Sequence, residues 1–235
     1  MDKKKVLVAI ALSLVLLRII YQVAPLRNFE EEPTLEEQYI QLPEPIRDSE
    51  TSVEEALEGR RSVRDYAEEK LLLEDVSQLT WAAQGVTDDR GYRTAPSAGA
   101  TYPLELYVAV GSEGIENLST GVYRYLPEKH AINKTSKEDV RGELVEAAHG
   151  QSFIGDAPVV FVFVADYERT TEAYGERGKR YVKMEVGHAA QNIYLQAETR
   201  NLGTVVVGAF TDDEVKEILD TQKDPLYIVP VGKTY

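Results

Sequence analysis

Three arginines and a serine stand within five residues, at Arg60-Arg61-Ser62-Val63-Arg64. Arginine side chains bind phosphate oxygens through two parallel hydrogen bonds, and a serine hydroxyl adds a neutral donor. The segment therefore predicts a phosphate-binding turn. A solvated basic turn that pairs with neighbouring glutamates is the alternative that these residues leave open.

A short helix directly before this turn is marked at both ends. Ser52 and Glu55 stand in the register of a capping box, in which each side chain binds a backbone N–H at the start of a helix. Gly59 is a typical helix stop. We therefore expect the basic side chains to follow the end of a helix.

Composition excludes several classes of function. The chain has 235 residues and a net charge of −14. Residues 1–27 carry five basic groups against Asp2, a net of +4, so the remainder stands at −18. Nucleic acid is not an expected partner, because binding it requires a basic surface. The absence of cysteine excludes disulfides, a thiolate nucleophile, iron–sulfur clusters and cysteine zinc sites.

The N-terminus reads as a membrane segment followed by a linker. Lysines precede an apolar run from Val6 to Val23, which as a helix is ~27 Å long, close to a hydrocarbon core. We predict an uncleaved anchor at residues 1–27, with the domain on the extracytoplasmic side. A cleaved signal peptide is the alternative, although no A-x-A site is present. Residues 28–50, acidic and containing proline, predict an extended tether, and residues 51–235 a single domain.

Helical and alternating patterns are mixed without regular βαβ order, which favours an α+β fold. The expected helices, besides the first, lie at residues 73–84, 137–148, 179–201 and 211–219. The expected strands lie at residues 104–110, 121–125, around 131–132, 159–164, 204–207 and 227–231.

Four stretches together resemble the nitroreductase-like FMN enzymes, and specifically their SagB-type dehydrogenase branch, which includes azoline dehydrogenases. They are RRSVRDY at 60–66, APSAGATYPLELYV at 95–108, EVGHAAQNIYLQAETRNLGTVVVGAF at 185–210 and VPVGK at 229–233. The resemblance implies a central, mostly antiparallel sheet flanked by helices. It also implies a homodimer with FMN at the subunit interface.

The resemblance assigns flavin contacts to basic residues. Arg60 and Ser62 match the phosphate and ribityl ligands of the family, and Arg61 lies beside them. Arg64 matches the basic position that faces the pyrimidine edge of the flavin, where a fixed positive charge favours hydride acceptance. Lys233 matches another basic group near the phosphate.

Two loops are assigned to the flavin ring in the same way. Small residues suit such loops, because a backbone must approach a flat ring closely. The first loop contains Ser97, Ala98, Gly99 and Ala100, and the second contains Val207 and Gly208. An ordinary flexible turn and a strand-ending glycine are the respective alternatives.

Tyr181 is the candidate catalytic residue, because azoline dehydrogenases of this branch use a Lys-Tyr pair for proton removal. The chain offers Lys179-Arg180-Tyr181, and packing of Tyr181 in the core or an interface is the alternative. Glu185 and His188 share a helix face, but one histidine without others nearby does not predict a metal site. We expect a structural, partly buried His188 and no metal.

The predicted function is an FMN-dependent oxidoreductase that moves hydride between NAD(P)H or an organic substrate and an acceptor by a ping-pong mechanism. One alternative is an azoline dehydrogenase that acts on peptides. Another is a flavin-binding or electron-transfer module at the membrane that no longer catalyses a reaction.

Overall fold

The computed structural model describes residues 39–235, so the predicted anchor at residues 1–27 and the first part of the predicted tether lie outside the described residues. In the described part of the chain, no helix has both the length and the apolar character needed to cross a membrane.

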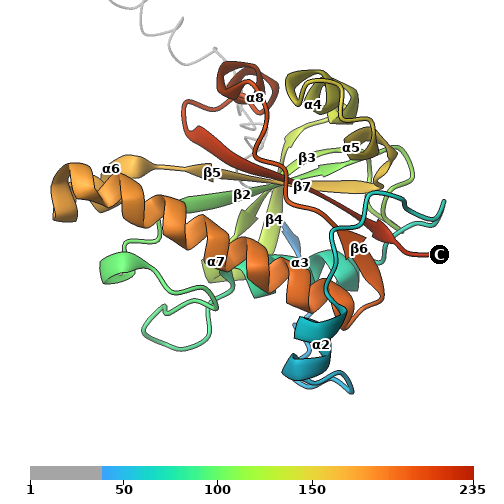
Figure 1. The fold of residues 1–235 in the computed structure, drawn as a ribbon, viewed down its shortest axis with the longest axis horizontal. Helices are drawn as coiled ribbons and strands as arrows, with labels where there is room; N and C mark the ends of the chain where they lie inside the picture. The colour runs from blue at the N-terminus through green and yellow to red at the C-terminus, as the bar shows by residue number, and fades with distance from the viewer. Residues whose placement is uncertain (1–38) are drawn as a thin grey trace, which may run out of the picture. The chain divides into compact units, whose positions relative to one another are not determined.

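A seven-stranded sheet forms the centre of the described domain, in the order β1-β4-β3-β2-β5-β7-β6, and all neighbouring strands are antiparallel (Figure 1). The strands are β1 (Tyr39–Gln41), β2 (Leu104–Val110), β3 (Gly121–Leu126), β4 (Ala131–Ser136), β5 (Val159–Ala165), β6 (Leu202–Thr204) and β7 (Asp224–Lys233). The predicted α+β fold with an antiparallel sheet is confirmed.

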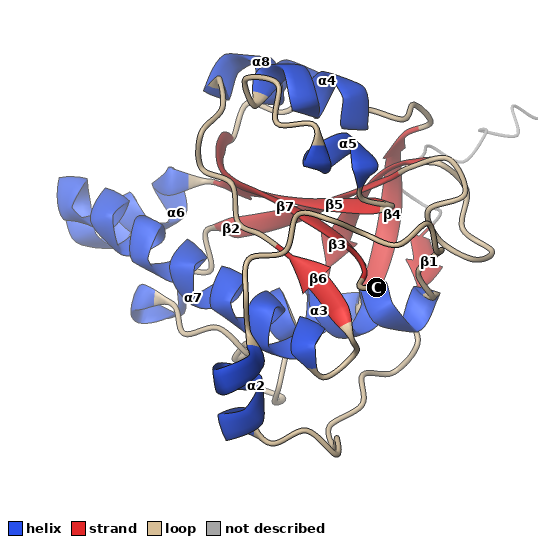
Figure 2. Cartoon of the chain, turned by 45° about the vertical axis from the view of Figure 1, so that its right-hand side comes forward, coloured by secondary structure: helices blue, strands red, loops and turns tan. Residues whose placement is uncertain are grey.

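Helices cover both faces of the sheet, which explains why its central strands are apolar throughout (Figure 2). In β5, Phe161 and Phe163 pack on one face, while Val160 and Val162 pack on the other, and all four are fully buried. The first face is covered by α3 (Leu73–Gln84) and α7 (Gly178–Glu198). The second is covered by α4 (Arg141–Ala147), α5 (Phe153–Asp156) and α8 (Asp212–Ile218).

The first helix, α2 (Val53–Gly59), begins with the predicted capping box. The Ser52 hydroxyl accepts the Glu55 N–H at 3.1 Å, and the Glu55 carboxylate accepts the Ser52 N–H at 2.7 Å. Two segment predictions name the right type of element but have wrong bounds. The helix expected at 137–148 is shorter in the structure, where it is α4. The strand expected at 204–207 ends at Thr204, and Val207 takes part only in an isolated β-bridge. Short elements without a prediction are β1, α5, η1 (Ala98–Ala100), η2 (Pro127–Lys129), α6 (Tyr167–Tyr174) and η3 (Gly175–Arg177).

The described end of the predicted tether packs on the domain, contrary to expectation. Strand β1 pairs with β4. Leu42 is 2% exposed, and its N–H binds the carbonyl of His130 at 3.1 Å. The backbone N–H and C=O of Ile46 both bind the Gln78 side chain, at 2.8 and 2.9 Å. The unpaired edge of β4 offers hydrogen bonds that a proline-containing acidic segment can use, so the fold includes residues 39–46.

Candidate functional site

The basic segment runs along the sheet edge formed by β6. The N–H of Val63 binds the carbonyl of Thr204 at 2.9 Å, and further along the Ala67 N–H binds the carbonyl of Lys233 at the same distance. The Arg60 guanidinium lies 5.1 Å from the Tyr194 ring on α7, and that of Arg64 lies 5.4 Å from the Phe153 ring on α5. The segment therefore crosses from one helical layer to the other and carries a positive charge at each side.

Tyr194, which the sequence analysis missed, contacts three parts of this edge. Its hydroxyl is hydrogen-bonded to Ser62 Oγ at 3.1 Å and accepts the Val206 N–H at 2.9 Å. Its ring lies under the Arg60 guanidinium. A partly buried tyrosine usually finds a partner for its hydroxyl. This rule could have indicated from the sequence that the Tyr194 hydroxyl is hydrogen-bonded, but it does not identify the hydrogen-bond partner.

Arg61 points back to the helix before it. Its Nη1 donates to the carbonyls of Glu58 and Arg60, both at 2.8 Å. The last carbonyls of a helix lack partners within the helix and favour a cation nearby. Arg61 is therefore occupied with the end of α2, and its assignment to the cofactor stays a prediction.

Lys233 is held by a buried carboxylate. Asp75, at the start of α3, is 1% exposed. Its two oxygens lie 3.2 Å from Lys233 Nζ and 2.6 Å from Arg200 Nε. An ammonium has three donors, so Asp75 fixes the position of Lys233 beside the basic segment and leaves donors for an anion.

Of the two backbone N–H groups predicted to contact the flavin ring from the loop after β6, one is available to a ligand. The N–H of Val207 donates to the carbonyl of Ile228 at 2.8 Å. Gly208 is exposed, and among the described residues its N–H has no hydrogen-bond partner. A Cβ at Gly208 would meet only the Tyr227 ring, at 3.5 Å. Gly208 is thus the better candidate for a backbone donor to a ligand.

The small-residue loop adopts unusual backbone angles. Gly99, Ala100 and Tyr102 have φ values of 61°, 53° and 44°. For a residue with a Cβ, the left-handed region costs ~1–2 kcal/mol. Such strain persists only where the surroundings fix the backbone, and it is common at binding sites.

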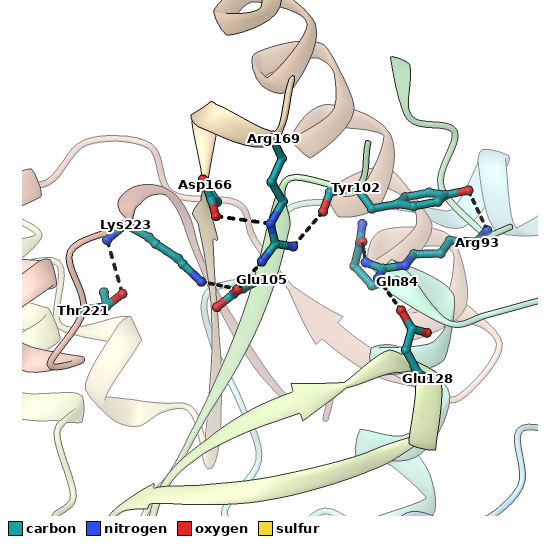
Figure 3. Close-up of polar contacts among 9 residues, drawn as sticks. All are labelled: Gln84, Arg93, Tyr102, Glu105, Glu128, Asp166, Arg169, Thr221 and Lys223. Carbon is teal, nitrogen blue, oxygen red and sulfur yellow. Dashed lines mark hydrogen bonds and ion pairs between the residues drawn. The ribbon is translucent and has the colours of Figure 1, made fainter. Parts of the chain in front are cut away.

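Two arginines hold this loop through Tyr102 (Figure 3). Arg169 Nη1 donates to the Tyr102 carbonyl at 3.1 Å, and the Arg93 N–H donates to the Tyr102 hydroxyl at the same distance. The Arg93 guanidinium also lies 4.6 Å from the Tyr102 ring. Arg169 is itself paired with Glu105 at 3.0 Å, and Lys223 binds the same carboxylate. The loop is therefore fixed in one conformation.

Tyr181 is connected to this loop through Tyr174. Its ring packs edge-on against that of Tyr174, with centroids 5.2 Å apart. A Cβ at Gly99 would lie 2.7 Å from the Tyr174 hydroxyl. Lys179 is exposed and paired with Glu176 at 2.9 Å. Tyr174 thus borders the loop, Tyr181 packs against Tyr174, and Lys179 is not paired with Tyr181.

Glu185 and His188 differ from the expected arrangement. His188 is exposed, so the prediction that it is partly buried is wrong. Glu185 is 2% exposed. Burial raises the pKa of the Glu185 carboxyl to about 7, while hydrogen bonding with Ser97 and the charge of Arg93 oppose this rise. Of these two side chains on α7, the buried ionisable group is therefore Glu185 and not His188.

Two groups of predicted site residues border α7, namely the small-residue loop and the part of the basic segment around Ser62, while Arg64 and Lys233 contact α5 and α3. The loop group meets the helix at Glu185, and the basic group meets it at Tyr194. These positions are nine residues apart in sequence, which is ~14 Å and two and a half turns of a helix. The two groups therefore lie on opposite sides of α7 within one chain.

A groove of about 630 Å³ opens between residues 46–53, α3 and α7, and its lining includes Trp81, Asn192 and Arg200. In the described part of the chain, none of the predicted flavin ligands lines it. Within one chain, the predicted flavin ligands therefore lie along the edge of the sheet and outside this groove.

Comparison with known proteins adds the family. Residues 57–233 match the Nitroreductase family. A nitroreductase-family protein of Methanocaldococcus jannaschii is 52% identical over 194 residues, covering 83% of this chain and 96% of the relative. A nitroreductase-family crystal structure from Ralstonia eutropha is 31% identical with a TM-score of 0.73, covering 84% of this chain and 90% of the other. The microcin B17-processing protein McbC of Escherichia coli is 30% identical over 131 residues, covering 54% of this chain and 48% of McbC.

Proposed function

Because the chain belongs to the Nitroreductase family of oxidoreductases, we propose that it binds FMN along the β6 edge and transfers hydride from a reduced nicotinamide to an organic acceptor. The observation that carries the proposal is the grouping of Arg60, Ser62 and Lys233 at one edge, held by Tyr194 and Asp75. Lys233 retains donors for a phosphate, and the Gly208 N–H is available for a ring atom.

FMN, when bound, would supply the chemistry of hydride acceptance and release. The side chains supply binding and charge. Arg60, Ser62 and Lys233 would hold the phosphate and ribityl chain, and Arg64 would add positive charge that favours hydride acceptance. Tyr181 would donate or accept the proton that accompanies hydride transfer. We expect ping-pong kinetics, in which the oxidised nicotinamide leaves before the acceptor binds.

A homodimer is part of this proposal. The loop at Ser97–Ala100 and the basic group lie on opposite sides of α7, so one chain does not bring both to the same ligand. A second copy would supply the missing loop. The exposed stripe of α7 that includes Met184, Gly187 and His188 is the surface available for this contact.

The first test is cofactor binding by the full-length chain. The purified protein should carry FMN, lose its flavin absorbance with NADH or NADPH, and regain it with a quinone or nitroarene. Arg60→Ala should weaken FMN binding by about tenfold to hundredfold, because a hydrogen bond to a charged group contributes ~1.5–3 kcal/mol. Arg90→Ala is the matched control, since Arg90 is exposed and paired with Asp88.

Equal FMN affinity in Arg60→Ala and the parent would remove Arg60 from the phosphate site. A chain that binds no FMN at any concentration would overturn the proposal. Bound flavin that no nicotinamide reduces would instead favour the non-catalytic module.

The similarity to McbC supports a second candidate, oxidation of an azoline in a peptide with electrons passing to oxygen. The arrangement of Lys179 argues against it, because that side chain is paired with Glu176. Formation of an azole from a synthetic azoline peptide, with consumption of oxygen, is the distinguishing measurement.

Membrane attachment through residues 1–27 is a proposal that rests on the sequence alone. Separation of cells that make the full chain into membrane and soluble fractions tests it.

A further inference from the structure

His130, between η2 and β4, contacts three consecutive residues of the N-terminal segment, which we define as residues 39–46. The His130 carbonyl accepts the Leu42 N–H and the side-chain amide of Gln41, both at 3.1 Å. Its ring atom Nε2 lies 2.9 Å from the Pro43 carbonyl oxygen. The φ of His130 is 45°, in the left-handed region that a residue with a Cβ seldom adopts. Backbone strain of this kind persists only where the surroundings fix it, and the proposed function gives His130 no role.

Both nitrogens of the His130 ring also contact a side chain of another element. Nε2 lies 2.8 Å from Ser77 Oγ on α3, and Nδ1 lies 2.9 Å from the Tyr125 hydroxyl on β3. A serine beside a histidine can act as a nucleophile, but Ser77 is 1% exposed and a substrate does not reach it. The ring instead joins the N-terminal segment to α3 and β3.

The Pro43 carbonyl determines which ring nitrogen carries the proton when His130 is neutral. A carbonyl oxygen only accepts hydrogen bonds, and the Ser77 hydroxyl already donates to this one. The close contact between this oxygen and Nε2 is favourable only if Nε2 also carries a proton. Nδ1 then has no proton and accepts from the Tyr125 hydroxyl. The neutral ring therefore satisfies every group that it contacts.

A second proton on the ring disturbs this arrangement. It would be placed on Nδ1 and would point at the Tyr125 hydroxyl, whose own proton already lies between the two atoms. Tyr125 is 3% exposed, and burial raises the pKa of its phenol, so the phenol keeps that proton. In the described part of the chain, the Tyr125 hydroxyl makes no second hydrogen bond. Charging His130 therefore breaks a buried hydrogen bond, which is unfavourable.

The charges around His130 do not offset this effect. Burial lowers the pKa of His130 below its ordinary value of 6.5, while the Pro43 carbonyl and the Glu44 carboxylate oppose the shift. Glu44 is exposed, so water screens its charge. The other charged side chains on the elements that pack against the ring leave this direction unchanged. They are Glu74 and Asp75 on α3, Arg124 on β3, Glu128 and Lys129 on η2, and Lys134 on β4.

We propose that His130 makes the docking of the N-terminal segment depend on pH: the neutral ring holds residues 39–46 on the domain, and the protonated ring releases them. Docking is complete above the ordinary pKa of 6.5, because the docked ring binds fewer protons than the free one, and it weakens as pH falls below that value. Ile46 lines the groove beside α3 and α7, so release also opens one wall of that groove. This inference does not depend on FMN binding.

Hydrogen exchange of the full chain between pH 5 and 8 tests the proposal. The probes are the N–H groups of Leu42 and Ile46, which bind His130 and Gln78. Their protection, corrected for the intrinsic exchange rate at each pH, should fall about threefold to tenfold from pH 7.5 to pH 5, the scale of one hydrogen bond. Protection in β5 is the internal reference. An equal loss there would mean general acid unfolding and would overturn the proposal.

His130→Gln is the decisive variant, because an amide can donate to the Pro43 carbonyl at every pH and does not titrate. Its protection at Leu42 and Ile46 should stay constant over the same range. His149→Gln is the matched control, since His149 is exposed and also has a positive φ, of 58°, and it should keep the fall of the wild type. A fall in His130→Gln as large as in the wild type would overturn the proposal.

Titration of the wild-type His130 ring by NMR gives a second reading that does not require the variant to dock its segment. The ring should titrate below 6.5, and the loss of protection should begin only below that pH. A ring that titrates at or above 6.5 would overturn the proposal, as would protection that is independent of pH in the wild type.

Discussion

Tyr194 shows how one side chain can order a site that the sequence distributes widely. It contacts Ser62, which is 132 positions away, together with the Val206 N–H and the Arg60 guanidinium. A phenol ring is rigid and presents both an apolar face for a cation and a hydroxyl for two hydrogen bonds. Tyr194 therefore fixes the two side chains proposed to bind the phosphate and ribityl chain of FMN.

We predict that Tyr194→Phe lowers the free energy of unfolding by ~1–2 kcal/mol, since two hydrogen bonds are lost while the ring remains under Arg60. FMN affinity should fall less than in Arg60→Ala, because Ser62 becomes mobile but stays present. Urea denaturation and FMN titration measure the two effects. Tyr92→Phe is the control, as Tyr92 is 45% exposed; identical losses in both variants would contradict the role of the Tyr194 hydroxyl.

At the scale of elements, the loop from Ser97 to Tyr102 is fixed by side chains from three directions. Arg93 comes from the segment after α3, Arg169 from α6, and Thr170 bonds to Thr101 at 2.8 Å. The positive φ values of this loop show that these contacts outweigh local preference. A loop held in this way keeps its shape when a ligand binds or leaves.

We predict that Gly99→Ala destabilises the protein more than Gly91→Ala. Both glycines have positive φ, but a Cβ at Gly91 meets nothing within 4 Å, whereas at Gly99 it lies 2.7 Å from the Tyr174 hydroxyl. Backbone strain of ~1 kcal/mol is common to both, so the difference in unfolding free energy measures the contact. Adding Tyr174→Phe to Gly99→Ala should recover part of that difference in unfolding free energy. Equal stability of Gly99→Ala and Gly91→Ala would show that the Tyr174 side chain moves away from the new Cβ without destabilising the protein.

At the scale of the whole molecule, the sheet is buried on both faces, and α7 is the long element that borders both groups of site residues. Its outer stripe leaves Met184 46% exposed, and a Cβ at Gly187 would meet nothing within 4 Å. Glycine inside a helix costs ~0.5–1 kcal/mol relative to alanine. Close packing of the α7 helix of a second copy against Gly187 would explain why this position is glycine despite that cost.

We predict that Gly187→Glu leaves the chain folded but converts a dimer into monomers with weakened FMN binding. Within one chain the added side chain has open space, so only a partner helix would be displaced. Sedimentation measures the mass, and circular dichroism the fold. Gly142→Glu is the control, because Gly142 lies exposed on α4 and also has nothing within 4 Å; a parent chain that sediments as a monomer would refute the dimer.

Local pattern was sufficient for some elements and not for others. The helix at 73–84 and the strand at 104–110 were predicted to the residue, because their apolar spacing, stops and caps lie within the segments. The strand predicted after Gly203 was misplaced, since β6 depends on pairing with β7 at the end of the chain. The predicted tether was too long, because β1 is stabilised by β4 across about 90 residues.

The sequence by itself determined the α+β class, because this is carried by short-range periodicity, and its motifs gave the family and the candidate ligands through their resemblance to known proteins. Only the tertiary structure decided what those residues touch. It turned Arg61 to the carbonyls of α2, buried Glu185 while exposing His188, and joined Ser62 to Tyr194. The physical reason is that burial and long-range hydrogen bonds depend on which elements pack together, and neighbouring letters of a sequence do not contain that information.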